Sequence, residues 1–320
     1  MQDREPLPRK TFSGQGYPSR GVEVIPTGSL RLDIALRLGG VPRGRIIEIF
    51  GPISSGKTTI CQHIIAEAQS LGEICAFIDV DHTFDVRYAQ RCSIDLERLI
   101  VSEPMGAEQA LETAFTLTSS RAAGVVVVDS INSLVTEAEL TAKIDNPGEP
   151  PIDLLVSQTL QRMVPSLEET RSIVLFTNRS HPKSVIYHKL KDNPAKLALK
   201  LHAAIRLKLT MMSPIKINNE ISGQTTRVHI VKNTLAPCFD SIELDIMYNE
   251  GIRKAGEILD LGEKLALIEQ QDSFYYYNSL RFGPGREVAI KFLNHNDLIS
   301  GEIEQVIRQR LIPPVANPPN

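Results

Sequence analysis

The residues with the clearest chemistry lie at positions 51–59, where the chain reads Gly-Pro-Ile-Ser-Ser-Gly-Lys-Thr-Thr. The two glycines let main-chain amides wrap closely around a phosphate chain, and Lys57 supplies positive charge for the β- and γ-phosphates. The Thr58 hydroxyl suits a bound Mg²⁺. We therefore expect a nucleoside triphosphate to be bound by Gly51, Pro52, Ile53, Ser54, Ser55, Gly56, Lys57, Thr58 and Thr59.

The flanking sequence favours this interpretation over a chance match in a loop. Residues 45–50 form a short apolar run that is typical of a buried strand. Residues 59–68 place Ile60, Ile64 and Ile65 on one face of a helix. A strand, a glycine-rich turn and a helix together aim main-chain N–H groups and a helix N-terminus at a phosphate.

Two carboxylates that follow predicted strands are candidates for the catalytic chemistry. Four valines precede Asp129, and a strand buried on both faces would deliver this carboxylate beside the phosphate-binding residues. There it can accept a hydrogen bond from Thr58 or from water bound to Mg²⁺. Asp81 follows the apolar run 74–80 and is expected to orient the attacking water. The alternative is a helix-capping role, for which Asp85 is also well placed.

Tyr88 lies three residues beyond Asp85, one turn into the predicted helix. Its ring could stack on a nucleotide base, or it could simply be part of the core. The sequence leaves both interpretations open.

Length and composition describe an ordinary globular chain. Its 320 residues, with 42% hydrophobic and 23% charged, can form one large core and a second small domain. A net charge of −3 does not favour nucleic-acid binding by the whole surface, so such a site must be a local patch. Cys61 and Cys75 fall in predicted core elements, and the four cysteines have no metal-type spacing. Without a signal-peptide pattern or a long apolar run, we expect a cytoplasmic protein with no membrane partner.

The predicted elements alternate between strands and helices, which indicates an α/β fold with a mostly parallel sheet flanked by helices. The clearest of these elements are strands at 74–80, 99–102, 125–129 and 173–178 and a helix at 150–169. Three later runs suggest antiparallel strands that extend the sheet, at 204–212, 226–231 and 241–247.

The composition divides the chain into four parts. These are a short, extended and poorly packed segment at 1–28, the core at 29–252, a small C-terminal α/β domain at 253–312 and a proline-rich, disordered tail at 313–320. In the C-terminal domain we expect a helix at 257–270, an aromatic strand at 274–277, a turn at 283–285 and a helix at 301–311.

Several segments resemble the bacterial RecA recombinase family. The similarity covers roughly residues 22–312 and is carried by residues 25–36, 39–46, 51–59, 76–79, 127–130, 231–233 and 250–252. The resemblance implies a RecA-like P-loop ATPase core, and an ATP-controlled filament on single-stranded DNA that pairs it with a homologous duplex. Recombination, DNA repair and the SOS response are the processes implied. By this likeness Asp85 and Tyr88 lie near adenine, while Thr58 and Asp129 hold Mg²⁺.

The chain also departs from the family pattern. Asp81 stands where the family has a catalytic glutamate, and its shorter side chain predicts slow hydrolysis. Arg179 stands where the family has a glutamine that senses the γ-phosphate; a guanidinium can contact phosphate but cannot accept a hydrogen bond. Of two lysines that reach a neighbouring subunit's ATP, Lys232 remains and Thr234 replaces the other. The family's N-terminal docking helix and acidic tail are expected to be missing, which favours a diverged paralogue. The expected catalytic residues are Lys57, Asp81, Asp129 and Arg179.

A basic segment at residues 179–202 is the candidate DNA-binding region. Its cationic side chains are Arg179, Lys183, Lys189, Lys191, Lys196 and Lys200. Against one acid, Asp192, they give a local charge of about +5, as contact with phosphates requires. The alternative is a solvated helix face. By the resemblance, residues 143–151 would form a first DNA loop, but their own charges do not argue for DNA.

Three interpretations remain open. The first is a DNA-dependent ATPase that uses ATP and Mg²⁺ and binds single-stranded DNA, with duplex DNA and self-association as further partners. The second is an accessory or regulatory paralogue that binds ATP and DNA with weak or no hydrolysis. The third is an ATPase that acts on a protein partner, with the basic segment as a dock for an acidic surface.

Overall fold

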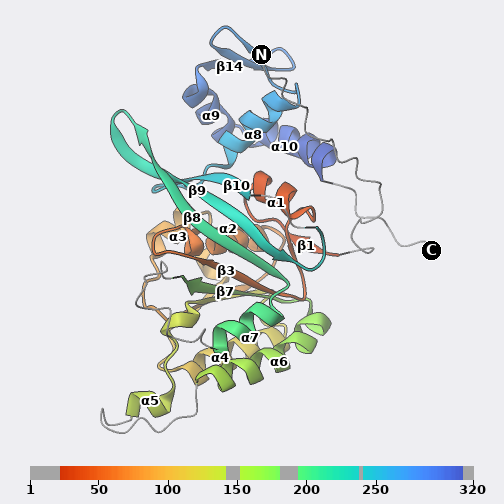
Figure 1. Ribbon diagram of the computed structural model, residues 1–320. Helices are drawn as coiled ribbons and strands as arrows, with labels where there is room; N and C mark the ends of the chain where they lie inside the picture. Colours follow the sequence, from red (N-terminus) through yellow and green to blue (C-terminus); the bar gives the residue numbers. More distant parts are fainter. Residues whose placement is uncertain (1–21, 142–151, 181–193, 238–240, 313–320) are drawn as a thin grey trace, which may run out of the picture.

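The computed structural model describes residues 22–141, 152–180, 194–237 and 241–312. Within these residues a nine-stranded mixed sheet runs through the centre of the molecule (Figure 1). From one edge to the other its strands are β11 (Gly251–Ile252), β10 (Ser241–Met247), β9 (Glu220–Asn233), β8 (Ile205–Ile217), β3 (Ile46–Gly51), β7 (Ile173–Arg179), β6 (Val125–Asp129), β4 (Cys75–Asp79) and β5 (Leu99–Ser102). A separate two-stranded sheet pairs β1 (Val24–Ile25) with β2 (Val41–Pro42).

Pairing is parallel from β8 across β3, β7, β6 and β4 to β5, and antiparallel among β8, β9, β10 and β11. The carboxyl ends of the parallel strands therefore meet at one edge, where polar groups that follow them can converge. The prediction of an α/β fold with a mostly parallel sheet, extended by antiparallel strands, is confirmed.

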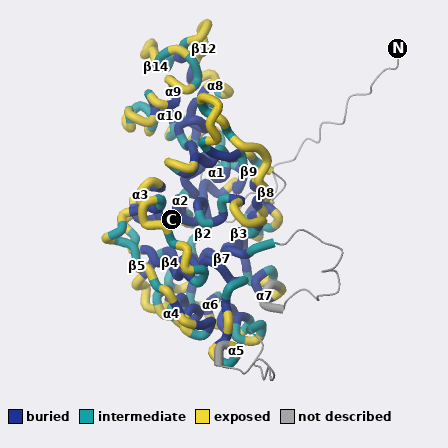
Figure 2. Tube along the Cα trace, turned by 90° about the vertical axis from the view of Figure 1, so that its left-hand side faces the viewer, coloured by how far each residue is buried: buried dark blue, intermediate teal, exposed yellow. Residues whose placement is uncertain are grey.

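Successive strand residues point to opposite faces, so each face carries its own hydrophobic core (Figure 2). In β6, Val125 and Val127 join one core and Val126 and Val128 the other. The first core includes residues of α1 (Leu30–Leu36), α2 (Lys57–Ser70) and α3 (Val86–Arg91). The second includes residues of α4 (Ala107–Ser119), α6 (Ile152–Thr170) and α7 (Pro194–His202). The remaining short helices of the core are η1 (Leu96–Arg98), η2 (Ile131–Ser133) and α5 (Glu137–Thr141).

Strands β8 and β9 are longer than predicted and form a hairpin that projects from the body of the molecule (Figure 1). Its distal half is largely exposed, and Met211 and Ile221 are both more than half accessible to solvent. A strand that is exposed on both faces lacks the alternation of apolar and polar residues by which strands are predicted. The predicted strands were therefore shorter than β8 and β9.

The C-terminal unit has a third hydrophobic core. Its elements are α8 (Lys254–Lys264), β12 (Glu269–Gln271), β13 (Phe274–Tyr277), β14 (Leu280–Pro284), α9 (Arg286–Asn294) and α10 (Asp297–Leu311). The helix predicted at 257–270 was wrong at both ends, because α8 starts earlier and stops at Lys264. Ala266 then adopts a left-handed φ of 53°, which turns the chain into β12.

The segment before α1 is packed more tightly than predicted. Ile25 is fully buried in the first core, and Thr27 is fully buried with its amide and hydroxyl both donating to Asp33. The expectation of poor packing is therefore wrong for this part of the segment. Residues 1–21 and the predicted tail at 313–320 lie outside the described residues. None of the helices in the described ranges is long and apolar enough to span a membrane.

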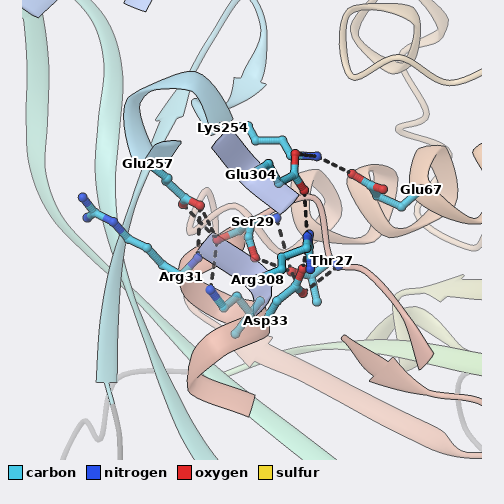
Figure 3. Close-up of polar contacts among 10 residues, drawn as sticks. Thr27, Ser29, Arg31, Asp33, Glu67, Lys254, Glu257, Glu304 and Arg308 are labelled. Carbon is cyan, nitrogen blue, oxygen red and sulfur yellow. Dashed lines mark hydrogen bonds and ion pairs between the residues drawn. The ribbon is translucent and has the colours of Figure 1, made fainter. Parts of the chain in front are cut away.

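A polar seam joins α1 to the C-terminal unit (Figure 3). Ser29 Oγ donates to Glu257 Oε1 at 2.9 Å, and Arg308 Nη2 donates to Asp33 Oδ2 at 2.8 Å. Leu30, the first residue of α1, is fully buried in the C-terminal core. We define the seam by these four polar residues together with Lys254, which contacts α2 through Glu67 and α10 through Glu304.

Candidate active site

The turn between β3 and α2 has a shape that requires glycine. Gly56 has φ of +89°, and a Cβ there would lie 2.4 Å from Ile246 Cδ1 of β10. A Cβ on Gly51 would lie 2.5 Å from the carbonyl oxygen of Leu209 in β8. Pro52, Ile53 and Ser54 at the outer part of the turn are exposed, as a surface that receives a ligand must be.

Lys57 begins α2 with its ammonium group turned back onto the turn. Its Nζ donates to the carbonyl oxygens of Pro52 at 2.7 Å and Gly51 at 3.3 Å. Burial lowers the pKa of Lys57, and the neighbouring guanidinium of Arg179 lowers it further, while Asp129 opposes the change. The site therefore holds a lysine that would gain from an anionic partner.

Asp129, the last residue of β6, lies beside the start of α2. Its Oδ2 accepts from Thr58 Oγ1 at 2.6 Å, and its Oδ1 accepts from the Thr177 hydroxyl of β7. Burial raises the pKa of Asp129, the hydroxyl donors lower it, and the charge of Asp81 raises it. The expected proximity of Asp129 to Thr58 is thus present. Together they offer the oxygen donors that Mg²⁺ prefers.

Asp81 and Arg179 form an ion pair with each other. Arg179 Nη2 donates to Asp81 Oδ2, and Ser130 Oγ donates to Asp81 Oδ1 at 3.2 Å. The Asp81 side chain is 7% exposed and that of Arg179 is 37% exposed. The structure therefore joins two positions at which the resemblance implies a departure from the family pattern. Sequence reasoning treated them separately.

Asp85 caps α3, as the alternative prediction stated, and its Oδ1 accepts from the amides of Arg87 at 2.8 Å and Tyr88 at 3.1 Å. The Tyr88 hydroxyl lies 3.1 Å from Thr59 Oγ1, and burial raises the pKa of Tyr88 to about 12. Tyr88 thus borders α2, the helix that follows the turn, and Asp85 lies at the start of α3. Their contact with adenine remains a prediction.

Lys232 of β9 closes the end of α7. Its Nζ donates to the carbonyl oxygens of Lys200 at 3.0 Å and Leu201 at 2.9 Å, and burial lowers its pKa. In a single chain its ammonium group is thus engaged within the same subunit. Contact with a neighbouring subunit's ATP stays a prediction.

The structure describes the basic segment at 179–202 at its two ends. Lys183, Lys189 and Lys191 lie outside the described residues, as does the side chain of Lys196, and so do residues 143–151. Arg179 and Lys200 flank the gap, Arg179 at the end of β7 and Lys200 in the last turn of α7.

Two further residues shape the site and were missed by sequence reasoning. Gln224 of β9 donates through Nε2 to the carbonyl oxygen of Ser54 at 2.7 Å, so the antiparallel part of the sheet supports the turn. Asn132 accepts from the amide of Arg179 and donates to its carbonyl oxygen at 3.4 Å. Single polar residues in a strand or a short helix give no motif, so no sequence signal could have found them.

Comparison with known proteins gives matches along nearly all of the chain. The model of the RecA N-terminal domain matches residues 13–253, and the model of the RecA C-terminal domain matches residues 256–312. A curated relative, "Protein RecA" of Roseiflexus castenholzii, is 45% identical over 296 residues, which is 92% of this chain and 84% of the relative. "Protein RecA" of Caldanaerobacter subterraneus is 47% identical over 90% of this chain and 84% of its own length. That of Chloroflexus aurantiacus is 41% identical over 93% and 86%.

Proposed function

Because the chain belongs to the RecA family, we propose that it is an ATP-binding, DNA-dependent ATPase that binds single-stranded DNA in homologous recombination and DNA repair. The observation that carries the proposal is the convergence of Lys57, Asp81, Asp129 and Arg179 at one edge of the sheet. This arrangement places an ammonium group, a guanidinium and two carboxylates beside the glycine-rich turn at residues 51–59. Phosphoryl transfer to water requires such a set.

In this proposal the turn at 51–59 cradles the triphosphate, and Lys57 exchanges its carbonyl partners for phosphate oxygens. Thr58 and Asp129 hold Mg²⁺, which neutralises phosphate charge when it is bound. Asp81 orients the attacking water. Asp85 and Tyr88 would border the adenine side of the nucleotide; the position of the Tyr88 hydroxyl 3.1 Å from Thr59 Oγ1 supports this for Tyr88.

DNA contact is assigned to the basic segment at 179–202. Its charge of about +5 is the supporting observation, since counterion release supplies most non-specific affinity for DNA. The same proposal includes binding of duplex DNA and a filament of this chain in which Lys232 lies near a neighbour's ATP. It also includes a part in the SOS response and cytoplasmic localisation. They follow from the family rather than from a contact in this chain.

The test is ATP turnover measured with and without single-stranded DNA over a range of salt concentrations. The proposal expects stimulation by DNA that falls steeply as salt rises. DNA binding without turnover would favour the accessory paralogue, a second candidate that the engagement of Asp81 by Arg179 supports. Absence of both DNA binding and DNA-stimulated turnover would refute the DNA assignment and favour a protein partner.

A further inference from the structure

The main chain of Arg179 is fixed at the edge of the nucleotide site. In the parallel register of β3 and β7, Arg179 is the partner of Gly51, the first residue of the glycine-rich turn. The next amide, of Ser180, donates to the carbonyl oxygen of Gly51 at 3.0 Å. Asn132 binds both the amide and the carbonyl oxygen of Arg179. The backbone is therefore held beside the turn, and the side chain is the part that can change its partner.

The carboxylate that Arg179 binds is held just as firmly. The amide of Asp81 donates to the carbonyl oxygen of Asp129 at 3.2 Å, and the preceding amide of Val80 donates to the same oxygen at 2.8 Å. The Asp81 side chain is almost completely covered, with Arg179 on one oxygen and Ser130 on the other. A water that is to be activated by Asp81 must therefore compete with the guanidinium.

The guanidinium in turn lies where a phosphate chain would compete for it. Asp129 accepts from Thr58, the neighbour of Lys57, the amide of Asp81 donates to the carbonyl oxygen of Asp129, and Arg179 binds Asp81, so the four charged residues are linked by direct contacts. The charges of Arg179, Asp81 and Asp129 accordingly all act on Lys57. Without a ligand, two cations and two carboxylates balance each other. A triphosphate brings several negative charges to these residues, and Arg179 is the cation with the more exposed side chain and a long, rotatable reach.

We propose that Arg179 alternates between Asp81 and the terminal phosphate of ATP, and so couples the presence of ATP to the state of Asp81. It neutralises Asp81 when no triphosphate is bound and transfers to the terminal phosphate of ATP, so that Asp81 holds the attacking water only with ATP present. The inference rests on the proposed function. It adds that Asp81 and the terminal phosphate compete for the Arg179 guanidinium. Binding of ATP, but not of ADP, therefore depends on the side chains of both Arg179 and Asp81.

The competition gives the two residues opposite effects on binding. Arg179→Met keeps an unbranched apolar stem and removes the charged guanidinium, and it should weaken binding of a non-hydrolysable ATP analogue about 10- to 100-fold, with ADP binding unchanged. Asp81→Asn should tighten binding of the analogue about fivefold because the guanidinium is released, while turnover falls at least a hundredfold. In the double variant Asp81→Asn should no longer tighten binding, because no guanidinium remains to be released.

Isothermal titration of each variant with ADP and with the ATP analogue measures these changes. The matched control is Arg171→Met, two residues before β7, where the guanidinium pairs with Glu23 at 3.6 Å on the surface; it should leave both affinities unchanged. A wild-type chain that binds neither nucleotide would refute the proposed function itself. If both nucleotides bind and Arg179→Met leaves their ratio unchanged, only this inference is overturned. It is also overturned if Asp81→Asn tightens binding equally in the Arg179→Met background, because that result indicates simple charge repulsion.

Discussion

Glu257 is a buried carboxyl whose protonation should control the stability of the polar seam. Its side chain accepts from Ser29 Oγ and from the amide of Arg31, and it is 5% exposed. Burial raises its pKa from 4.5 to about 7, with the nearby charge of Asp33 acting in the same direction and that of Arg31 opposing it. The substitution Glu257→Gln keeps a side chain of the same shape and removes the titration.

The direction of the effect follows from proton binding. Between pH 4.5 and 7 the folded chain holds a proton on Glu257 that the unfolded chain has lost, so the folded state is favoured by that proton. This stability is fully present below pH 4.5 and is lost as the pH rises through 7. The separation of the two pKa values corresponds to about 3 kcal/mol in the free energy of unfolding.

Urea unfolding at pH 4.5 and pH 8 tests this expectation. The chain contains no tryptophan, and three of its seven tyrosines (Tyr275, Tyr276 and Tyr277) lie in the C-terminal unit, so unfolding of this unit contributes to the change in tyrosine fluorescence. Wild type should lose about 3 kcal/mol more than Glu257→Gln over this interval. Burial also raises the pKa of Asp33 to about 6, and Asp33 is present in both proteins. Because the charges of Asp33 and Glu257 interact, the difference between the proteins measures the titration of Glu257 together with its coupling to Asp33. Equal losses in the two proteins would refute the reasoning.

Three further predictions concern the nucleotide and DNA sites. Lys57→Ala should weaken ATP binding at least tenfold, because charge-assisted hydrogen bonds to phosphate contribute about 1.5–3 kcal/mol; unchanged affinity in a titration would contradict the phosphate assignment. Asp129→Asn should raise the Mg²⁺ concentration that gives half-maximal binding of an ATP analogue about tenfold, and an unchanged midpoint would remove Asp129 from the metal site. Neutralising Lys189, Lys191 and Lys196 together should reduce the slope of DNA affinity against salt by about two, since each lysine that neutralises a phosphate of a single strand adds about 0.7 to that slope. An unaltered slope would exclude these lysines from the DNA interface.

Elements with a strong local pattern could be predicted from the sequence. The strand at Val125–Asp129 has the predicted bounds, because four valines followed by a carboxylate specify a fully buried strand and its end. The same holds for the glycine-rich turn and for Asp85, whose capping role depends only on neighbours two and three residues away. Cys61 and Cys75 are buried in the core as expected.

Contacts between distant residues could not be predicted. Asp81 and Arg179 are 98 residues apart, and only the order of strands in the sheet brings their side chains together. The early end of α8 depends on the left-handed conformation of Ala266, which its residue type disfavours and which goes with hydrogen bonds from the amides of Ala266 and Leu267 back to Glu263 and Gly262. The buried pair of Glu48 and Arg206, on neighbouring strands β3 and β8, likewise has no local signal.

The burial of Leu30 among C-terminal side chains has a consequence for attempts to dissect the protein. A fragment cut after Ile252 would uncover Leu30 and deprive Asp33 of the Arg308 guanidinium. Lys254, which pairs with Glu67 of α2 and Glu304 of α10, would be removed as well. Such a fragment is expected to lose rigidity at the start of its own first helix. If the fragment is inactive, the cause would then be the disturbed structure around α1 rather than the loss of a function that belongs to the C-terminal unit.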